Sequence, residues 1–133
     1  MRSRTILLAA AAVLVLLGVA GPGGASVWNT DASANWSVAG DWTGGIPNAA
    51  DAIADFSTLN ITATRTVTID TTSRTVGSMI FADTTPTSSG WIIAGSGGGQ
   101  LTLDVTAGSP TVTVNNLGTG TASITATVNG NDG

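Results

Sequence analysis

Three tryptophans in the first half of the chain each stand beside a residue that can hydrogen-bond a sugar hydroxyl. The pairs are Trp28-Asn29, Asn35-Trp36 and Asp41-Trp42. An indole can stack on the apolar face of a pyranose while a neighbouring amide or carboxylate fixes the hydroxyls. These six residues therefore predict a carbohydrate-binding surface. We favour a second interpretation, in which the rings close the exposed end of a β-structured core with a large apolar plug.

Three carboxylates lie close enough in sequence to suggest a glycosidase pair, namely Asp41, Asp51 and Asp55. Such a pair needs its carboxyl groups roughly 5 to 9.5 Å apart in a cleft, a distance that spacing alone does not establish. Asp beside Gly or Pro is more typical of a turn residue that bonds its own backbone. The chain also lacks Cys, His, Lys, Tyr and Glu, so common nucleophile and base pairs and zinc sites cannot be assembled. We expect no enzyme, no catalytic residue and no cofactor.

Two further patterns resemble ligand sites without completing them. Asn29, Asp31, Ser33 and Asn35 alternate like calcium ligands, but the glycine at the sixth loop position and the acidic residue at the twelfth are missing. The glycine run at residues 95–99 resembles a phosphate loop, yet no helix is expected after it and no lysine exists. Both patterns are interpreted as turns, and no metal site is predicted.

The first 25 residues have the layout of a secretory signal peptide. Arg2 and Arg4 precede an apolar run over residues 6–19, and small residues follow as far as Ala25. The run is shorter than the roughly 20 apolar residues that cross a bilayer. We therefore predict cleavage after Ala25, export, and no membrane span in the mature chain. Cleavage after Ala20, where Gly18 and Ala20 are also small, and a retained membrane anchor are the alternatives.

The mature chain, residues 26–133, keeps two arginines against eight aspartates, a net charge of −6. Two cations cannot neutralise a run of phosphates, so a nucleic acid partner is not expected. Because the exported chain has no cysteine, its stability must come from regular β structure or from a larger neighbour rather than from disulfides.

Six segments after residue 57 carry β-branched and other apolar residues in period-two order, which is typical of strands with one buried face. They are residues 66–70, 75–81, 91–93, 101–104, 111–114 and 124–128, and their centres recur every 11 or 12 residues. Turn residues separate them, and no helix is needed. This spacing predicts an all-β fold, either an antiparallel β-sandwich or a solenoid with two strands and roughly 22 residues per coil.

We favour the solenoid because the strands become more uniform and less aromatic toward the C-terminus. Residues 129–133 have the composition of a turn before another strand. The expected architecture is an incomplete parallel β-helix with an N-terminal cap over residues 26–56 and a repeat region over 57–133. We expect this repeat region to be truncated, as a fragment of a longer protein. An open strand edge also predicts self-association.

The order of short motifs resembles the N-terminal region of bacterial exported proteins with autotransporter-associated β-strand repeats. The segments that carry the resemblance are residues 27–29, 34–37, 41–48, 51–56, 74–81, 91–93 and 99–104. The family's repeat ends in a turn containing Tyr, which this chain lacks. The resemblance implies a right-handed β-helix at the surface of a Gram-negative-type bacterium or outside it. It also implies a cap and lead-in for a stalk, serving adhesion or envelope architecture, with polysaccharide or the cell envelope as partner.

Overall fold

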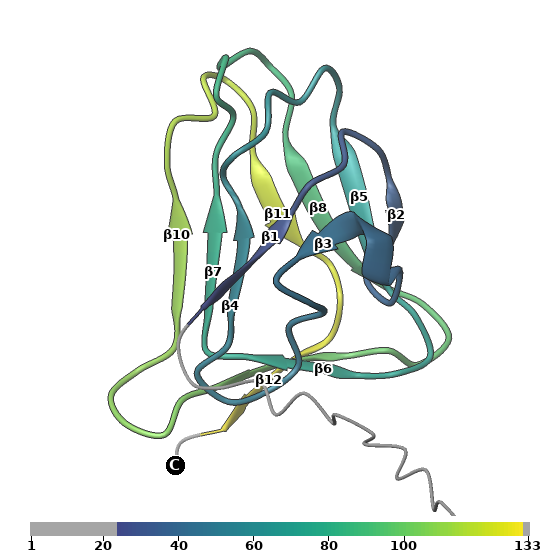
Figure 1. The fold of residues 1–133 in the computed structure, drawn as a ribbon, viewed down its shortest axis with the longest axis vertical. Helices are drawn as coiled ribbons and strands as arrows, with labels where there is room; N and C mark the ends of the chain where they lie inside the picture. Colours follow the sequence, from purple (N-terminus) through teal and green to yellow (C-terminus); the bar gives the residue numbers. More distant parts are fainter. Residues whose placement is uncertain (1–23, 132–133) are drawn as a thin grey trace, which may run out of the picture.

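The computed structural model describes residues 24–131, which form strands and turns (Figure 1). The strands are β1 (Ala25–Trp28), β2 (Ala34–Asn35), β3 (Trp42–Thr43), β4 (Ile53–Phe56), β5 (Arg65–Ile69), β6 (Arg74–Val76), β7 (Ser78–Phe81), β8 (Trp91–Gly95), β9 (Leu101–Asp104), β10 (Thr111–Val114), β11 (Ala122–Ile124) and β12 (Val128–Asn131). One 3₁₀ turn, η1, spans Ala39–Asp41. Within residues 24–131 no helix is long and apolar enough to cross a membrane. The predicted leader lies outside this range except for Gly24 and Ala25.

The strands build three sheets that wind around one core. Sheet A has the order β10-β7-β4-β1-β3, sheet B the order β11-β8-β5-β2, and sheet C the order β12-β9-β6. Every strand pair from coil to coil is parallel, and the antiparallel pair of β1 with β3 lies at one end of sheet A. The chain is therefore a parallel β-solenoid of about four turns. The predicted solenoid is confirmed, and the sandwich alternative is wrong because its strands would pair antiparallel.

Each full coil holds three strands, so the prediction of two strands and roughly 22 residues per coil is wrong. Ile53 pairs with Ser78, and Ser78 pairs with Thr111, so successive coils take 25 and 33 residues. The segment predicted as one strand over residues 75–81 is divided by Gly77 into β6 and β7. A Cβ at Gly77 would lie 2.6 Å from Asp51 Cα, so the corner between two sheets requires glycine here.

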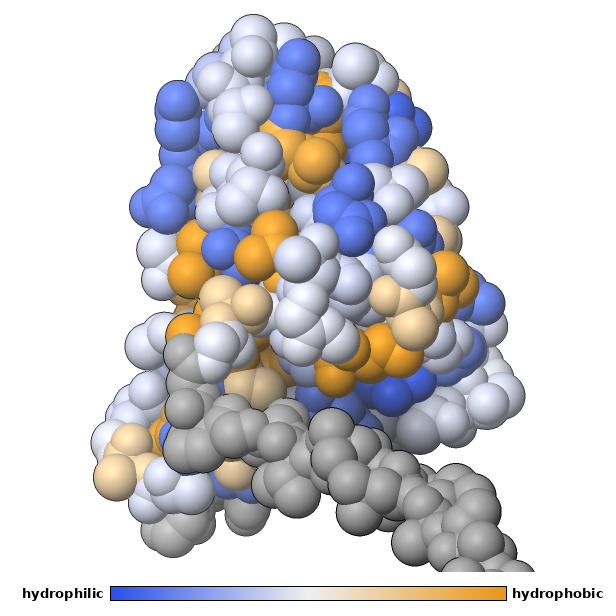
Figure 2. Space-filling view, in the orientation of Figure 1, coloured by the Kyte–Doolittle hydropathy of each residue, from blue (hydrophilic) through white to orange (hydrophobic). Residues whose placement is uncertain are grey.

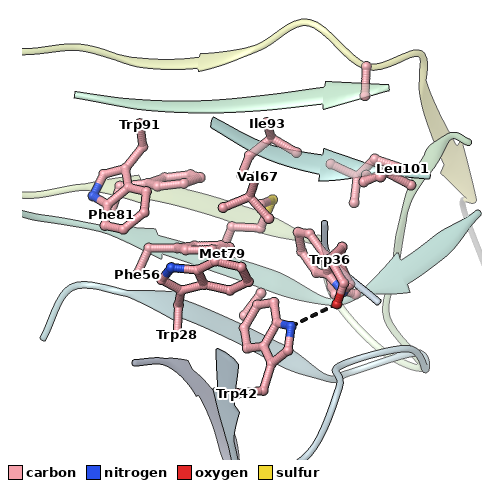
Figure 3. Packing of buried hydrophobic residues seen from close by; sticks show 14 of the residues in the cluster. Trp28, Trp36, Trp42, Phe56, Val67, Met79, Phe81, Trp91, Ile93 and Leu101 are labelled. Atoms are coloured by element: carbon pink, nitrogen blue, oxygen red, sulfur yellow. Dashed lines mark hydrogen bonds between the residues drawn. The ribbon is translucent and has the colours of Figure 1, made fainter. Parts of the chain in front are cut away.

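Buried side chains stack in rows along the solenoid axis because the strands pair in register. In sheet A, Phe56 pairs with Phe81, and the two rings stack at 5.2 Å between centroids (Figure 3). In sheet B, Val67 pairs with Ile93, and both are fully buried. Residues between the inward positions point away from the core. The period-two pattern of the sequence therefore gives one apolar interior shared by three sheets.

Two glycines allow neighbouring coils to touch through their backbones. A Cβ on Gly99 would lie 1.7 Å from the carbonyl oxygen of Asp70, and a Cβ on Gly120 would lie 1.7 Å from that of Ser89. No side chain fits such a gap. The glycine-rich turns therefore set the close stacking of coils as well as the reversal of the chain.

Candidate functional site

The N-terminal end of the solenoid is closed by indole rings. Trp28 and Trp36 are fully buried, and Trp42 is 5% exposed. Each ring nitrogen donates to a backbone carbonyl: Trp28 Nε1 to Thr30 O at 2.7 Å, Trp36 Nε1 to Pro47 O at 3.2 Å and Trp42 Nε1 to Trp36 O at 2.9 Å. The last of these bonds is drawn in Figure 3. The rings are thus held by their polar ends while their faces pack in the core.

Phe56 lies at the centre of this aromatic cluster (Figure 3). Its ring centroid is 5.4 Å from that of Trp42, 5.8 Å from that of Trp36 and 6.0 Å from that of Trp28. Trp28 and Trp42 meet edge to face, with centroids 5.1 Å apart and an interplanar angle of 85°. These distances are in the favourable range for aromatic pairs. The cluster therefore joins the first coil to the second.

At the N-terminal end the edges of β1 in sheet A and β6 in sheet C are covered as well, whereas β2 is the outermost strand of sheet B. β3 runs back antiparallel to β1, pairing Trp42 with Trp28. On sheet C, Ala49 N donates to Thr75 O at 2.8 Å and Thr75 N donates to Asn48 Oδ1 at 2.9 Å, so this segment occupies the edge of β6. Covered edges cannot accept a further strand.

The residues predicted to bind carbohydrate lie at this closed end. None of the three indoles offers a free face, and sugar stacking requires one. The side-chain amide of Asn29 bonds to the Thr43 hydroxyl at 3.1 Å. Asn35 is exposed at the end of β2. Carbohydrate binding stays a prediction, without the exposed aromatic platform on which it was based.

The three carboxylates considered for catalysis are each held by a different group. Asp41 accepts from the Thr30 hydroxyl at 2.8 Å, Asp55 accepts from Ser57 N at 2.8 Å, and Asp51 accepts from the Thr106 hydroxyl at 2.6 Å. Among residues 24–131 they share no hydrogen-bond partner. These hydrogen bonds stabilise turns and contacts between segments, which is a common structural role of aspartate side chains.

The alternating oxygen residues around Asp31 do not converge on a common point. Asp31 Oδ1 accepts from Arg65 Nε at 2.6 Å, and Thr62 also donates to this carboxylate. The bond from Arg65 holds the pKa of Asp31 down to about 2, from 3.8. Ser33 Oγ accepts from Thr66 N instead. Asp31 therefore joins the first coil to the second as an ion pair. No group of three metal-binding side chains occurs within the described range.

Asp51 forms a second connection between distant segments. Its backbone has a φ of 62°, a conformation that few residues other than glycine adopt. Its carboxylate accepts from Thr106 N at 3.0 Å as well as from the Thr106 hydroxyl, and these bonds lower the pKa of Asp51. The segment before β4 is thereby tied to the loop that leads into β10. Neither Arg65 nor Thr106 was identified as a partner from sequence.

The C-terminal end of the solenoid is open. β10, β11 and β12 are the outermost strands of the three sheets on this side, each paired along one edge. At inward positions in β10 and β12, Val112 is 42% exposed, Val114 is 52% exposed and Val128 is 45% exposed. Their row neighbours Met79, Phe81 and Leu101 are fully buried. We call the end formed by β10, β11 and β12 the C-terminal face.

The C-terminal face carries no ionisable side chain. Residues 105–131 contain no charged residue, whereas residues 26–83 contain both arginines and six aspartates. Proteins usually protect an exposed strand edge with charged side chains or proline. In the side view of Figure 2, small hydrophobic patches lie among weakly polar and strongly hydrophilic residues. This uneven distribution of charge is readable from the sequence, yet only the position of these residues on an open end makes it meaningful.

A shallow hollow of about 220 Å³ lies beside this face, between residues 95–100 and residues 125–127. Its lining consists of glycines, Ala126 and polar side chains without a charge. Gly97 and Gly98 have φ values of 61° and 90°, so the glycine run forms a turn, as expected from the sequence. None of the lining side chains is an acid or a base, so the hydroxyls of Ser96, Thr125 and Thr127 have no general base among the lining residues.

The chain matches no protein-family model, no curated protein and no solved structure.

Proposed function

We propose that this chain is an exported structural protein that caps the N-terminal end of a β-solenoid stalk and leads into it. The stalk would project further segments from a bacterial cell surface for adhesion or envelope architecture. The resemblance to exported proteins with autotransporter-associated β-strand repeats supports the compartment and the role. No catalytic step is part of this proposal.

One observation carries the proposal: the first end of the solenoid is closed and the other end is open. A cap must hinder strand addition, and the buried indoles, with β3 on the edge of β1 and residues 48–49 on the edge of β6, serve that need on sheets A and C. A lead-in must present free strand edges with apolar inward rows, as β10 and β12 do. Full burial of a valine side chain contributes about 1.5–3 kcal/mol, so covering each half-exposed valine would add roughly 1 kcal/mol.

The test is to identify the native product by its mass and its location. An antibody against residues 26–133 captures the product from separate cell fractions, and mass spectrometry measures the intact mass. We expect a mass far above that of residues 26–133, in the envelope or the medium. A product of that small mass, or one retained in the cytoplasm, would contradict the proposal.

A further inference from the structure

We propose that the C-terminal face is a docking surface for one further coil of uncharged, β-branched strands, which add in parallel to β10, β11 and β12. This inference rests on the proposed function and specifies the chemistry of the partner. Within the described residues, each of the three strands is the outermost strand of its sheet and is paired along one edge only. All three belong to one coil. A single added strand would cover only one of the three edges, whereas a coil covers all three together.

The direction of the partner follows from the pairing already present. Thr111 to Val114 pair in parallel with Ser78 to Phe81, and Val128 pairs in parallel with Leu101. An added coil that repeats this register places its inward residues on Val112, Val114 and Val128. Those side chains retain 42%, 52% and 45% exposure, so β-branched or leucine residues above them would complete the rows.

The charge of the partner follows from what the face can offer it. Residues 105–131 have no charged side chain to pair with an incoming ion. A charge buried on the valine rows would lose its hydration without gaining a partner. The side-chain hydrogen bond between Asn129 Nδ2 and Gln100 Oε1, at 2.8 Å, shows that neutral amides satisfy the outward row. The face therefore accepts a coil whose inward residues are neutral and rejects one with a charge at an inward position.

A second copy of this chain fits the face less well than a coil of the same kind. Stacking head to tail would bring the face against an end that β3 and the buried indoles already cover. Stacking face to face would make the strands meet antiparallel, a pairing that no two successive coils use in the described residues. The copy is therefore an alternative outcome of the test rather than the expected partner.

The experiment adds the missing neighbour in cis. A copy of residues 105–131 is inserted between Asn131 and Asp132 of the full chain, which matches the offset of 27 residues between Leu101 and Val128. We expect amide hydrogen exchange in β10, β11 and β12 to slow by about tenfold or more. The melting temperature should rise by about 4–8 °C.

The matched control carries the same insert with Val112→Asp, Val114→Asp and Val128→Asp made only in the inserted copy. Protection of β10–β12 by the neutral insert but not by the charged insert supports the proposal. Equal protection by both inserts overturns the selection against charge. No protection by either insert overturns the docking surface itself, because the parent coils are unchanged in both proteins.

The unmodified full chain supplies the remaining outcomes. A monomer whose β10–β12 amides exchange as slowly as those of β4–β6 would show that the face is already closed, and would overturn the inference. A defined dimer with these amides protected would assign the face to a second copy and overturn it too. These outcomes concern the purified chain, so they are distinct from the proposed function, which fails on the mass or the location of the native product.

Discussion

The two ends of the solenoid belong to the same three sheets but differ in how far their core residues and strand edges are covered. At the N-terminal end, Trp28, Trp36 and Trp42 are buried, and β3 covers the edge of β1. At the C-terminal face, Val112, Val114 and Val128 are about half exposed, and the strand edges are free. The comparison shows that strand pattern alone does not close a solenoid. Closure requires large side chains and a segment that turns back over the edge.

One row of sheet A makes the comparison direct. Phe56, Phe81 and Val114 are register partners, so they occupy the same inward position in three successive coils. Phe56 and Phe81 are fully buried, but Val114 is 52% exposed. The residue type and its neighbours therefore change along a row while the backbone geometry is retained.

The largest difference in unfolding free energy is expected between side-chain truncations at the two ends of this row. Phe56→Ala should cost about 3–5 kcal/mol, since it removes the ring that contacts the tryptophan cluster. Val114→Ala should cost less than about 1 kcal/mol because the side chain is already half exposed. Urea unfolding followed by tryptophan fluorescence measures both values. Phe56→Leu serves as a milder variant if Phe56→Ala does not fold, and similar losses from Phe56 and Val114 truncation would remove the distinction between the ends.

A smaller difference in stability is expected between substitutions of the two glycines at which neighbouring coils touch. Gly99→Ala and Gly120→Ala both place a Cβ 1.7 Å from a carbonyl oxygen. Gly99→Ala separates inner coils and should lower the unfolding free energy by about 2 kcal/mol, whereas Gly120→Ala should mainly release the last coil. Hydrogen exchange distinguishes the two: faster exchange throughout the chain for the first, and in β10 and β11 for the second.

Gly40→Ala is the matched control for these substitutions, because nothing lies within 4 Å of its added Cβ. Its unfolding free energy should stay within about 0.5 kcal/mol of the unchanged chain. If Gly120→Ala speeds hydrogen exchange throughout the chain as much as Gly99→Ala does, the last coil unfolds together with the inner coils. That result would contradict the expected difference.

The smallest effect is expected from the ion pair between the first two coils. Asp31→Asn should cost about 0.2–1 kcal/mol at neutral pH, the usual range for a partly exposed pair. Because the pKa of Asp31 is lowered to about 2 from 3.8, its stabilising contribution is complete above pH 3.8 and is lost as pH falls toward 2. Urea unfolding between pH 5 and pH 2 should therefore show a smaller loss of stability for Asp31→Asn than for the unchanged chain.

The same pH series also compares the two ends. Residues 105–131 contain no titratable side chain, but Asp51 accepts hydrogen bonds from Thr106 that lower the pKa of its carboxyl group. Protonation of Asp51 at low pH weakens these bonds, so local opening should increase in the loop before β10 and change less in β11, once intrinsic exchange rates are corrected. Equal acid sensitivity of Asp31→Asn and the unchanged chain would show that the Arg65 contact does not stabilise the fold.

Part of the fold was predictable because local pattern and burial agree. The predicted strand over residues 101–104 coincides with β9, and that over 111–114 coincides with β10. The prediction over 124–128 was wrong, because β11 ends at Ile124 and β12 begins only at Val128. β-branched residues continue through the turn between them, so periodicity could not reveal that corner. The number of strands per coil was missed for the same reason.

The candidate site shows a second limit of local reasoning. The spacing of Trp28, Trp36 and Trp42 was compatible with a sugar platform as well as with the end plug that we favoured. Their exposure depends on Phe56 and Phe81, which approach only when the coils stack. The partners Arg65 of Asp31 and Thr106 of Asp51 lie 34 and 55 residues away. No local pattern specifies contacts over such separations.

The sequence by itself determined the β-rich character of the chain, the period-two strands, the absence of charge over residues 105–131 and the glycine-rich turns. These properties depend on residue type and on neighbours along the chain. The tertiary structure alone decided that three strands form each coil, that the indoles face inward, and that the neutral segment lies on an open end. Burial and edge pairing arise between residues that are distant in sequence, so they exist only once the coils have stacked.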